Sequence, residues 1–397
     1  MTAEQRFFLQ VLSDYIHGRA TEPPAGRLDW GRVLTFAQIH GLTGVTWLQC
    51  REHLGEDPEV LARLHGGFFS DVFHFVCRNR DFQEVSAAFA EAGIPFLPMK
   101  GTLLCRYHPV PQLRSMGDID LVIRPQDRRR AHEIMTGLGF SCMVDNHAVW
   151  TYKRDVITYE VHDHMMYEHL ANEMDYRGYF DHVWDYAVPL EGTCYGLDPS
   201  FHFLYLMAHT AKHMVNKGSG FRPFVDMVLM TRREALDWPW ITAQLKRLRL
   251  LDFTRICFAL CRVWFQVDMP LPAAKLDGAF YEQATRKAFL DGIFGLDNRE
   301  NQTGASAKAI KRSCLPYWLT ALCVTMKKLF PPYRDMQLIP WYSFVDGRPW
   351  LLPGAWLYRF YYCARYKKRH GKSLLEEPFI HRREIEARER FMRQWGL

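Results

Sequence analysis

The sequence lacks the cysteine patterns of a disulfide scaffold or a zinc site. Its ten cysteines are scattered between positions 50 and 363, and no two form a Cys-x-x-Cys pair. Structural disulfides and cysteine-ligated zinc both need clustered cysteines at short spacings, so we expect neither. Cys257 and Cys261 lie four residues apart in a stretch with helical periodicity, and we interpret them as small buried hydrophobic residues.

A long apolar run is also missing. The most apolar window, residues 315–326, lies between Arg312 and Lys327 and is shorter than the roughly 20 residues needed to cross a bilayer. Residues 1–6 are largely polar, and no apolar run or small-residue cleavage pattern of a secretory signal follows them. We therefore expect a cytoplasmic protein with no membrane span.

Neither sign of charge dominates. The 50 basic and 44 acidic side chains give a formal net charge of +6 at pH 7. This small excess is spread over the chain without a continuous basic stripe, which counts against nucleic acid as the main partner. Hydrophobic residues make up 48% of the 397 residues, enough to build a sizeable core. At roughly 100–200 residues per domain, the length suggests more than one domain.

The spacing of apolar residues divides the chain into four parts. Residues 1–92 have helical spacing and are predicted to form an N-terminal helical lobe. Residues 93–190 mix short apolar runs with a helix, as in a small α/β core. Residues 191–330 return to helical spacing, and residues 331–397 form an aromatic and basic helical tail. The predicted fold is therefore α+β: a small mixed sheet with extensive N- and C-terminal helical lobes.

Within the α/β core, the sequence predicts the order strand, helix, strand, helix and hairpin. The predicted strands are residues 94–99, 119–123, 147–152 and 156–162, the first helix opens at Gly101, and the second lies between residues 125 and 138. Lys153, Arg154 and Asp155 form the predicted hairpin turn. Pro98 has no backbone N–H to donate, so its strand is expected at an edge of the sheet or at a bulge.

Two acidic residues at the start of one predicted strand carry the strongest chemical signal. Alternate residues of a strand share a face, so Asp118 and Asp120 should project together while Ile119 and Leu121 enter the core. Two carboxylates on one face repel each other, and a divalent cation is the usual compensation. Mg²⁺ fits best, with Mn²⁺ as a substitute, because it binds one or two carboxylates together with phosphate oxygens.

Such a metal site needs a third carboxylate, and a second strand offers one. In residues 158–162 the polar side chains alternate with Tyr159 and Val161, so Glu160 and His162 share a face. We expect Glu160 to complete the metal site and to act as a base toward an acceptor hydroxyl. His162 would lie beside it.

An alternative for Glu160 stays open. Its carboxylate could pair with Lys153 or Arg154 on the neighbouring strand, while Asp163 supplies the third ligand. His162, His164 and His169 are close in sequence, but they match no established spacing for a transition metal.

A glycine and a hydroxyl residue follow the first predicted strand. Gly101 and Thr102 open a helix there, which brings free backbone N–H groups and a hydroxyl to a helix N-terminus. Lys100 and Arg114 add positive charge nearby, and an arginine can hold phosphate through two parallel hydrogen bonds. These residues predict a site for a polyphosphate.

The pattern resembles the polymerase-beta-like nucleotidyltransferase superfamily and, more closely, an uncharacterised bacterial nucleotidyltransferase family. The matching residues are Lys100, Gly101, Arg114, Asp118, Ile119, Asp120, Tyr159, Glu160, Val161, His162, Ala208, Lys212, His213, Arg222 and Asp226. The resemblance covers roughly residues 30–260. Thr102 stands where the wider superfamily usually has serine.

The resemblance implies a nucleotidyltransferase core at residues 93–190 and a defined reaction. A nucleoside monophosphate, AMP in particular, would pass from an NTP such as ATP to a hydroxyl of an unknown acceptor, with release of pyrophosphate. The implied metal-binding and catalytic residues are Asp118, Asp120 and Glu160, with Mg²⁺ or Mn²⁺ as the cofactor. The implied nucleotide-binding residues are Lys100, Gly101, Thr102, Arg114 and Lys212.

Other interpretations of these residues remain. Lys212 could be a solvated helix lysine, and Arg222 could pair with Asp226 four residues along the same helix. The alternative function is a non-catalytic nucleotide- or nucleic-acid-binding module on the same fold. Such a module would keep its NTP affinity when Asp118 and Asp120 are replaced by Asn.

Overall fold

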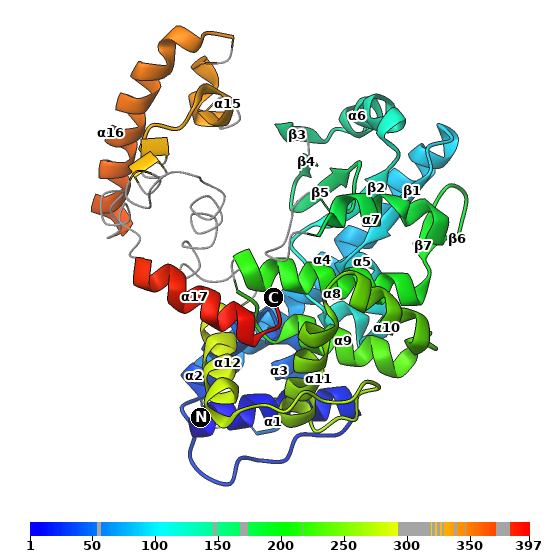
Figure 1. Cartoon of the computed structure of the whole chain (residues 1–397), viewed down its shortest axis with the longest axis vertical. Coiled ribbons are helices and arrows are strands. Elements are labelled where there is room, and N and C mark those ends of the chain that lie inside the picture. The colour runs from blue at the N-terminus through cyan, green and yellow to red at the C-terminus, as the bar shows by residue number, and fades with distance from the viewer. Residues whose placement is uncertain are drawn as a thin grey trace. The chain divides into compact units, whose positions relative to one another are not determined.

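The computed structural model arranges the chain in two compact units (Figure 1). One consists of Met1–Cys142, His147–Leu296 and Gln394–Leu397, and the other of Met143–Asn146 and Asp297–Arg393. The described residues are 1–53, 57–145, 149–166, 174–216, 218–292, 319, 322–323, 326–327, 329–336, 340–345, 347–370 and 382–397. None of the helices in these ranges is both long and apolar enough to span a bilayer.

The first unit begins with four helices. They are α1 (Ala3–His17), α2 (Trp30–His40), α3 (Thr43–Cys50) and α4 (Pro58–Glu91). The Thr2 hydroxyl caps α1 by accepting a hydrogen bond from the Gln5 backbone N–H, and the Gln5 side chain bonds back to the Thr2 N–H. α4 is one continuous helix of 34 residues.

A five-stranded mixed sheet follows α4 in the order β1-β2-β5-β4-β3. The strands are β1 (Phe96–Met99), β2 (Ile119–Ile123), β3 (Ser141–Asp145), β4 (Val149–Arg154) and β5 (Ile157–His162). β2 is parallel to β5 and antiparallel to β1, and β4 is antiparallel to β5. The mixed sheet and the helical lobes confirm the predicted α+β fold.

Two details of the sheet bear on the predictions. Pro98 lies in β1, which is an edge strand as its missing N–H requires. The predicted hairpin joins β4 to β5, but β4 extends to Arg154, so its turn is Asp155 and Val156, with Asp155 at φ 50°. β3 was not predicted.

One face of the sheet is apolar and covered by helices. Ile119 and Leu121 of β2 are buried in a cluster that includes Val85 and Phe89 of α4 and Met135 of α6 (Arg128–Gly137). Because side chains alternate along a strand, the neighbours of these core residues point to the opposite face. That opposite face carries the acidic residues.

The connection from β1 to β2 and the segment after β5 complete the first unit. Short helices α5 (Gly101–Leu104), η1 (Cys105–Tyr107) and η2 (Pro111–Leu113) join β1 to β2, and η3 (Pro125–Asp127) precedes α6. α7 (Tyr176–Phe180), η4 (Asp181–Tyr186) and the hairpin β6 (Ala187–Pro189) and β7 (Tyr195–Leu197) follow β5.

Part of the predicted helical segment 191–330 lies in the same unit, which includes His147–Leu296. It contains α8 (Pro199–Asn216), α9 (Arg222–Arg233), α10 (Trp238–Arg247), α11 (Leu251–Phe265) and α12 (Gly278–Asp291). Cys257 and Cys261 lie in α11 and are both fully buried, as expected for small core residues.

The second unit has its own small core. Its described elements are α15 (Tyr333–Met336), η5 (Pro340–Val345), η6 (Pro349–Leu351), α16 (Leu352–His370) and α17 (Arg382–Gln394). Trp356 packs against the buried cluster of this unit, whereas Leu357 and Tyr361 are exposed. The aromatic stretch of α16 is therefore only partly buried.

Candidate active site

The parallel pairing of β2 with β5 brings two acidic residues side by side. Asp120 is in register with Glu160, and Val122 with His162. The Nε2 atom of His162 lies 3.0 Å from Asp120 Oδ1 and 3.5 Å from Glu160 Oε2. Asp120, Glu160 and His162 each offer a possible ligand atom, and these atoms all lie within 4.8 Å of one another. Residues 40 positions apart thus form one polar cluster.

Asp118 lies just before β2 and not within it. Burial raises the pKa of its carboxyl to about 6, repulsion by Asp120 and Glu160 adds to this effect, and the positive charge of Lys100 opposes it. Asp118 therefore belongs to the same electrostatic environment as the two strand carboxylates.

Lys100 is the cation beside the acidic group, by which we mean Asp118, Asp120 and Glu160. Its Nζ atom lies 2.5 Å from Asp120 Oδ1. Burial by itself would raise the pKa of Asp120, but Lys100 and the hydrogen bond from His162 hold it at about 2. Burial would likewise lower the pKa of Lys100, and Asp120 reverses that effect. The pair therefore stays charged near neutral pH.

The turn after β1 leaves no room for a side chain at Gly101. A Cβ atom there would lie 2.5 Å from Arg114 Nη1 and 2.5 Å from Met116 Sδ. Thr102, the next residue, has a buried hydroxyl oxygen without a hydrogen-bond partner in the described part of the chain. Lys100 adopts a left-handed backbone conformation, with φ at 53°, just before this turn.

Arg114 is buried against the same turn. Its Nε and Nη2 atoms donate to Asp226 Oδ1 at 2.9 Å and Asp226 Oδ2 at 2.7 Å, while Nη1 is the atom nearest Gly101. His108 Nε2 also lies 2.9 Å from Asp226 Oδ1. Asp226 is therefore bonded to Arg114 and His108, and the expected pair with Arg222 on the same helix does not form.

Two residues of the alternative arrangement for Glu160, Arg154 and Asp163, have other partners. Arg154 pairs with Asp81 and Glu84 of α4. Asp163 Oδ2 lies 2.8 Å from Arg128 Nη1. His169 lies outside the described residues. The contacts of Glu160 therefore favour its grouping with Asp120 over a pairing with Arg154.

Helix α8 approaches the acidic group from the second helical segment. The Tyr205 hydroxyl donates to Met99 Sδ at 3.4 Å. One turn later, His209 Nε2 lies 3.2 Å from His213 Nε2. Burial lowers the pKa of His209 well below its ordinary value, and His213, Lys100 and Lys212 lower it further.

Lys212 therefore lies on the same helix as His209, whose pKa both Lys100 and Lys212 lower. Sequence reasoning missed Tyr205 and His209, although their spacing to residues 212 and 213 along α8 could have shown a shared helix face.

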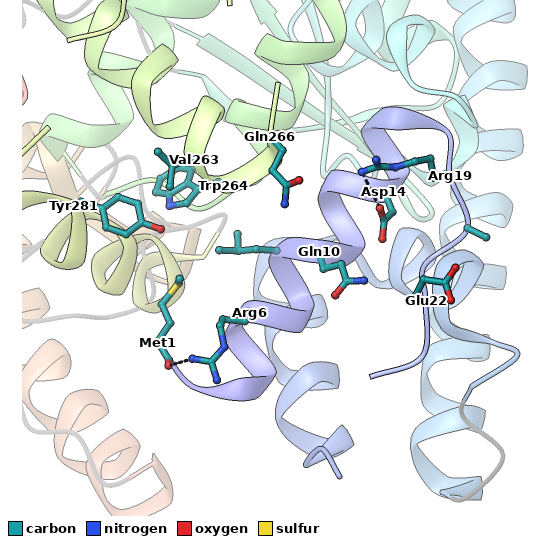
Figure 2. A pocket seen from close by; sticks show the side chains of 12 residues that line it. Met1, Arg6, Gln10, Asp14, Arg19, Glu22, Val263, Trp264, Gln266 and Tyr281 are labelled. Carbon is teal, nitrogen blue, oxygen red and sulfur yellow. Dashed lines mark hydrogen bonds and ion pairs between the residues drawn. The ribbon is translucent and has the colours of Figure 1, made fainter. Parts of the chain in front are cut away.

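A sizeable cavity in the first unit lies apart from these residues. It has a volume of about 810 Å³ and is lined mainly by α1 and by the end of α11 and the residue after it, including Arg6, Asp14, Trp264 and Gln266 (Figure 2). Asp14 in its wall already pairs with Arg19. None of the carboxylates near Lys100 lines this cavity, so the cavity is not part of the candidate active site.

Comparison with known proteins decides the family. A family model described as an uncharacterised nucleotidyltransferase matches residues 26–266. The chain belongs to this nucleotidyltransferase family. The matched range contains β1 to β5 and α8, and with them every residue of the acidic group and of the glycine turn. No curated protein and no solved structure matches the chain.

Proposed function

We propose that this family member transfers a nucleoside monophosphate, AMP in particular, from an NTP to a hydroxyl group of an acceptor. The observation that carries the proposal is the group of Asp120, Glu160 and His162, whose possible ligand atoms lie within 4.8 Å of one another, next to Lys100 and the tight turn at Gly101. Asp118 lies two residues before Asp120, and its carboxyl is repelled by Asp120 and Glu160. Carboxylates on adjacent strands and a glycine turn for phosphates are the two parts that such a transfer needs.

The charges of the site fit a divalent cation. Asp120 and Glu160 are in register on adjacent strands, both repel the Asp118 carboxyl, and Lys100 is paired with Asp120. Burial is the main cause of the raised pKa of Asp118, and repulsion by Asp120 and Glu160 adds to it. Mg²⁺ or Mn²⁺ would be held by these three carboxylates, since hard cations prefer oxygen ligands. When bound, the cation would offset the negative charge of the transferring phosphoryl group.

Glu160 is proposed as the base. Its side chain is 33% exposed, whereas that of Asp120 is 4% exposed, so an acceptor can reach Glu160 more easily. Glu160 would take the proton of the acceptor hydroxyl as the acceptor oxygen forms a bond to the α-phosphorus. The bond from that phosphorus to the bridging oxygen then breaks, and pyrophosphate leaves with the electron pair.

The nucleotide would be bound by residues on two sides of the site. The backbone of Gly101 and the Thr102 hydroxyl would contact the phosphates from the β1 turn, and Lys212 would approach from α8. Lys100 and Arg114 would add positive charge from fixed positions, because Asp120 and Asp226 already hold their side chains. They would act mainly through their positive charge and would not move to bind the phosphates directly.

Transfer of label from α-³²P-ATP tests the proposal. The wild-type protein is incubated with Mg²⁺ and fractionated cell extract, and labelled product and pyrophosphate are both measured. We expect Asp120→Asn to lower both by about 100-fold or more. Asp163→Asn is the matched control, because Asp163 pairs with Arg128 outside the acidic group. Equal incorporation by wild type and Asp120→Asn would contradict the enzymatic proposal.

ATP binding separates the proposal from a non-catalytic binding module. Calorimetry with a non-hydrolysable ATP analogue is carried out with and without Mg²⁺. The transferase should bind the analogue more tightly with the metal and lose this gain in Asp120→Asn, whereas a simple binding module should not.

A further inference from the structure

The loop that leads into Asp118 is held by side chains from two helices distant in sequence. Arg222 Nη1, at the start of α9, donates to the Ser115 carbonyl oxygen at 3.1 Å. Arg78 Nη1, on α4, donates to the next carbonyl, that of Met116, at 2.8 Å. Ser115 is also anchored by its own hydroxyl, which donates to the Gly41 carbonyl at 2.7 Å.

Asp118 depends on this loop because the sheet does not hold it. Backbone pairing of β2 with β5 begins at Ile119, and pairing with β1 involves Asp120 but not Asp118. The residue before Asp118 is Gly117, which is exposed and has no side chain to pack. The position of the Asp118 carboxylate therefore rests on the anchored residues 115 and 116.

Arg78 is an unusual residue to find in this place. Arg78 is only 6% exposed. Its Nε and Nη2 atoms are buried and have no hydrogen-bond partner in the described part of the chain. Leaving buried donors unbonded opposes folding, and each such case calls for an explanation. The bond to Met116 is the hydrogen bond that this guanidinium makes in the described structure, which points to the loop as its purpose.

We propose that Arg78 and Arg222 are positioning residues that hold Asp118 beside Asp120 and Glu160. They act on the backbone of residues 115 and 116 and through it on Asp118. This inference rests on the proposed function, because it assigns Asp118 to the metal-binding group. It adds Arg78 of α4, which the sequence did not point to, and gives a role to Arg222 of α9, which the sequence marked only as a match to the family.

Binding of Mn²⁺ provides a test that does not depend on the unknown acceptor. Electron paramagnetic resonance measures Mn²⁺ binding by the full chain with a non-hydrolysable ATP analogue. We expect Arg78→Met and Arg222→Met to weaken Mn²⁺ binding by roughly 10–100-fold, as loss of residues that orient metal ligands typically does. Arg222→Lys should stay close to wild type, because a lysine can still donate to one carbonyl.

The control comes from the same helix as Arg222. Arg232, at the other end of α9, also donates to a backbone carbonyl, that of Ile16, at 3.1 Å. Arg232→Met should therefore keep the Mn²⁺ affinity of the wild type. A general loss of stability in α9 would instead weaken binding in both variants.

Hydrogen exchange of residues 115–118 supplies a second measurement if a buried arginine variant fails to fold. Ser115→Ala is a mild change that removes only the bond to Gly41, and we expect it to speed amide exchange in this loop and to weaken Mn²⁺ binding. Slow exchange and unchanged Mn²⁺ binding in Ser115→Ala and in Arg222→Met would overturn the inference.

Asp120→Asn separates the proposed metal site from the positioning role of Arg78 and Arg222. If the wild type binds Mn²⁺ with the nucleotide and Asp120→Asn does not, the proposed site stands, and unchanged binding in the arginine variants rejects the positioning role alone. If Asp120→Asn binds Mn²⁺ like the wild type, the proposed site fails, and the positioning role fails with it.

Discussion

At the scale of single residues, the buried pair of Lys100 and Asp120 combines a strong attraction with a high cost of separation. Their charged atoms lie 2.5 Å apart, and Asp120 is almost fully buried. Removing one partner of such a pair leaves a charge without compensation in a site with little water. Replacing both partners removes that penalty.

We therefore expect Lys100→Met to lower the free energy of unfolding by about 3–5 kcal/mol. The double variant Lys100→Met/Asp120→Asn should be less destabilised than the sum of the two single changes, because neither partner is then left charged alone. Urea unfolding at pH 7 measures all three. Strictly additive effects would show that the two side chains do not interact as described.

A second prediction concerns Asp71 on α4. Burial raises the pKa of this carboxyl to about 7, although the Gly44 N–H and the charges of Arg78 and Arg222 oppose the shift. The folded state therefore binds the proton more tightly than the unfolded state does. Stability is lost as the pH rises from the ordinary value near 4 through 7, and the loss is complete above that range.

Asp71→Asn should consequently stabilise the protein at alkaline pH. We expect roughly 1–2 kcal/mol at pH 8, after allowing for screening by solvent, and a smaller gain at pH 5. The asparagine can still accept the hydrogen bond from Gly44. Thermal melts at pH 5 and pH 8 measure the effect, and a gain that grows toward acidic pH would show that the sign is wrong.

At the scale of elements, the turn between β1 and α5 is the most constrained part of the site. A Cβ atom at Gly101 would overlap both Arg114 and Met116. Arg114 cannot move away freely, because two of its nitrogens are bonded to Asp226. A larger residue must therefore displace the turn or break this pair.

Gly101→Ala is expected to lower the free energy of unfolding by about 1–3 kcal/mol, as overpacking typically does, and to weaken binding of an ATP analogue. Gly137→Ala is the matched control, since nothing lies within 4 Å of a Cβ atom there. Thermal melts and analogue titrations compare the two variants. Equal melting temperatures would mean that the turn can adjust without cost.

The strands that carry the acids were predictable, while their surroundings were not. The alternation in residues 119–123 and 157–162 fixes which side chains share a face, so Asp120, Glu160 and their buried neighbours followed from the sequence. β3 was missed because Ser141–Asp145 has no clear alternation. Its pairing with β4 depends on the sheet as a whole.

The ion pairs between residues far apart in the sequence were not predicted either. Helical spacing favoured a bond between Arg222 and Asp226, yet Asp226 is bonded to Arg114, which is 112 positions away. A competition between partners so far apart is decided by the tertiary fold, and local spacing carries no information about it. The same reason explains why the contact of Arg78 with Met116 could not be foreseen.

At the scale of the whole molecule, the last residues of the chain belong to the first unit. Gln394–Leu397 group with Met1–Cys142 and His147–Leu296. Trp395 is 2% exposed, and its ring centroid lies 6.0 Å from that of Phe253 and 5.4 Å from that of Phe280. The chain therefore returns to α11 and α12 after passing through the second unit.

Trp395→Ala should destabilise the first unit, because it leaves a cavity between Phe253 and Phe280. We expect a loss of about 3–5 kcal/mol in the free energy of unfolding, the usual range for a buried aromatic residue. Trp350→Ala is the control, since Trp350 is 71% exposed and should change stability by less than about 0.5 kcal/mol. Urea unfolding followed by circular dichroism compares the variants. If both changes have the same small effect, the C-terminal residues do not pack on α11 and α12 in solution.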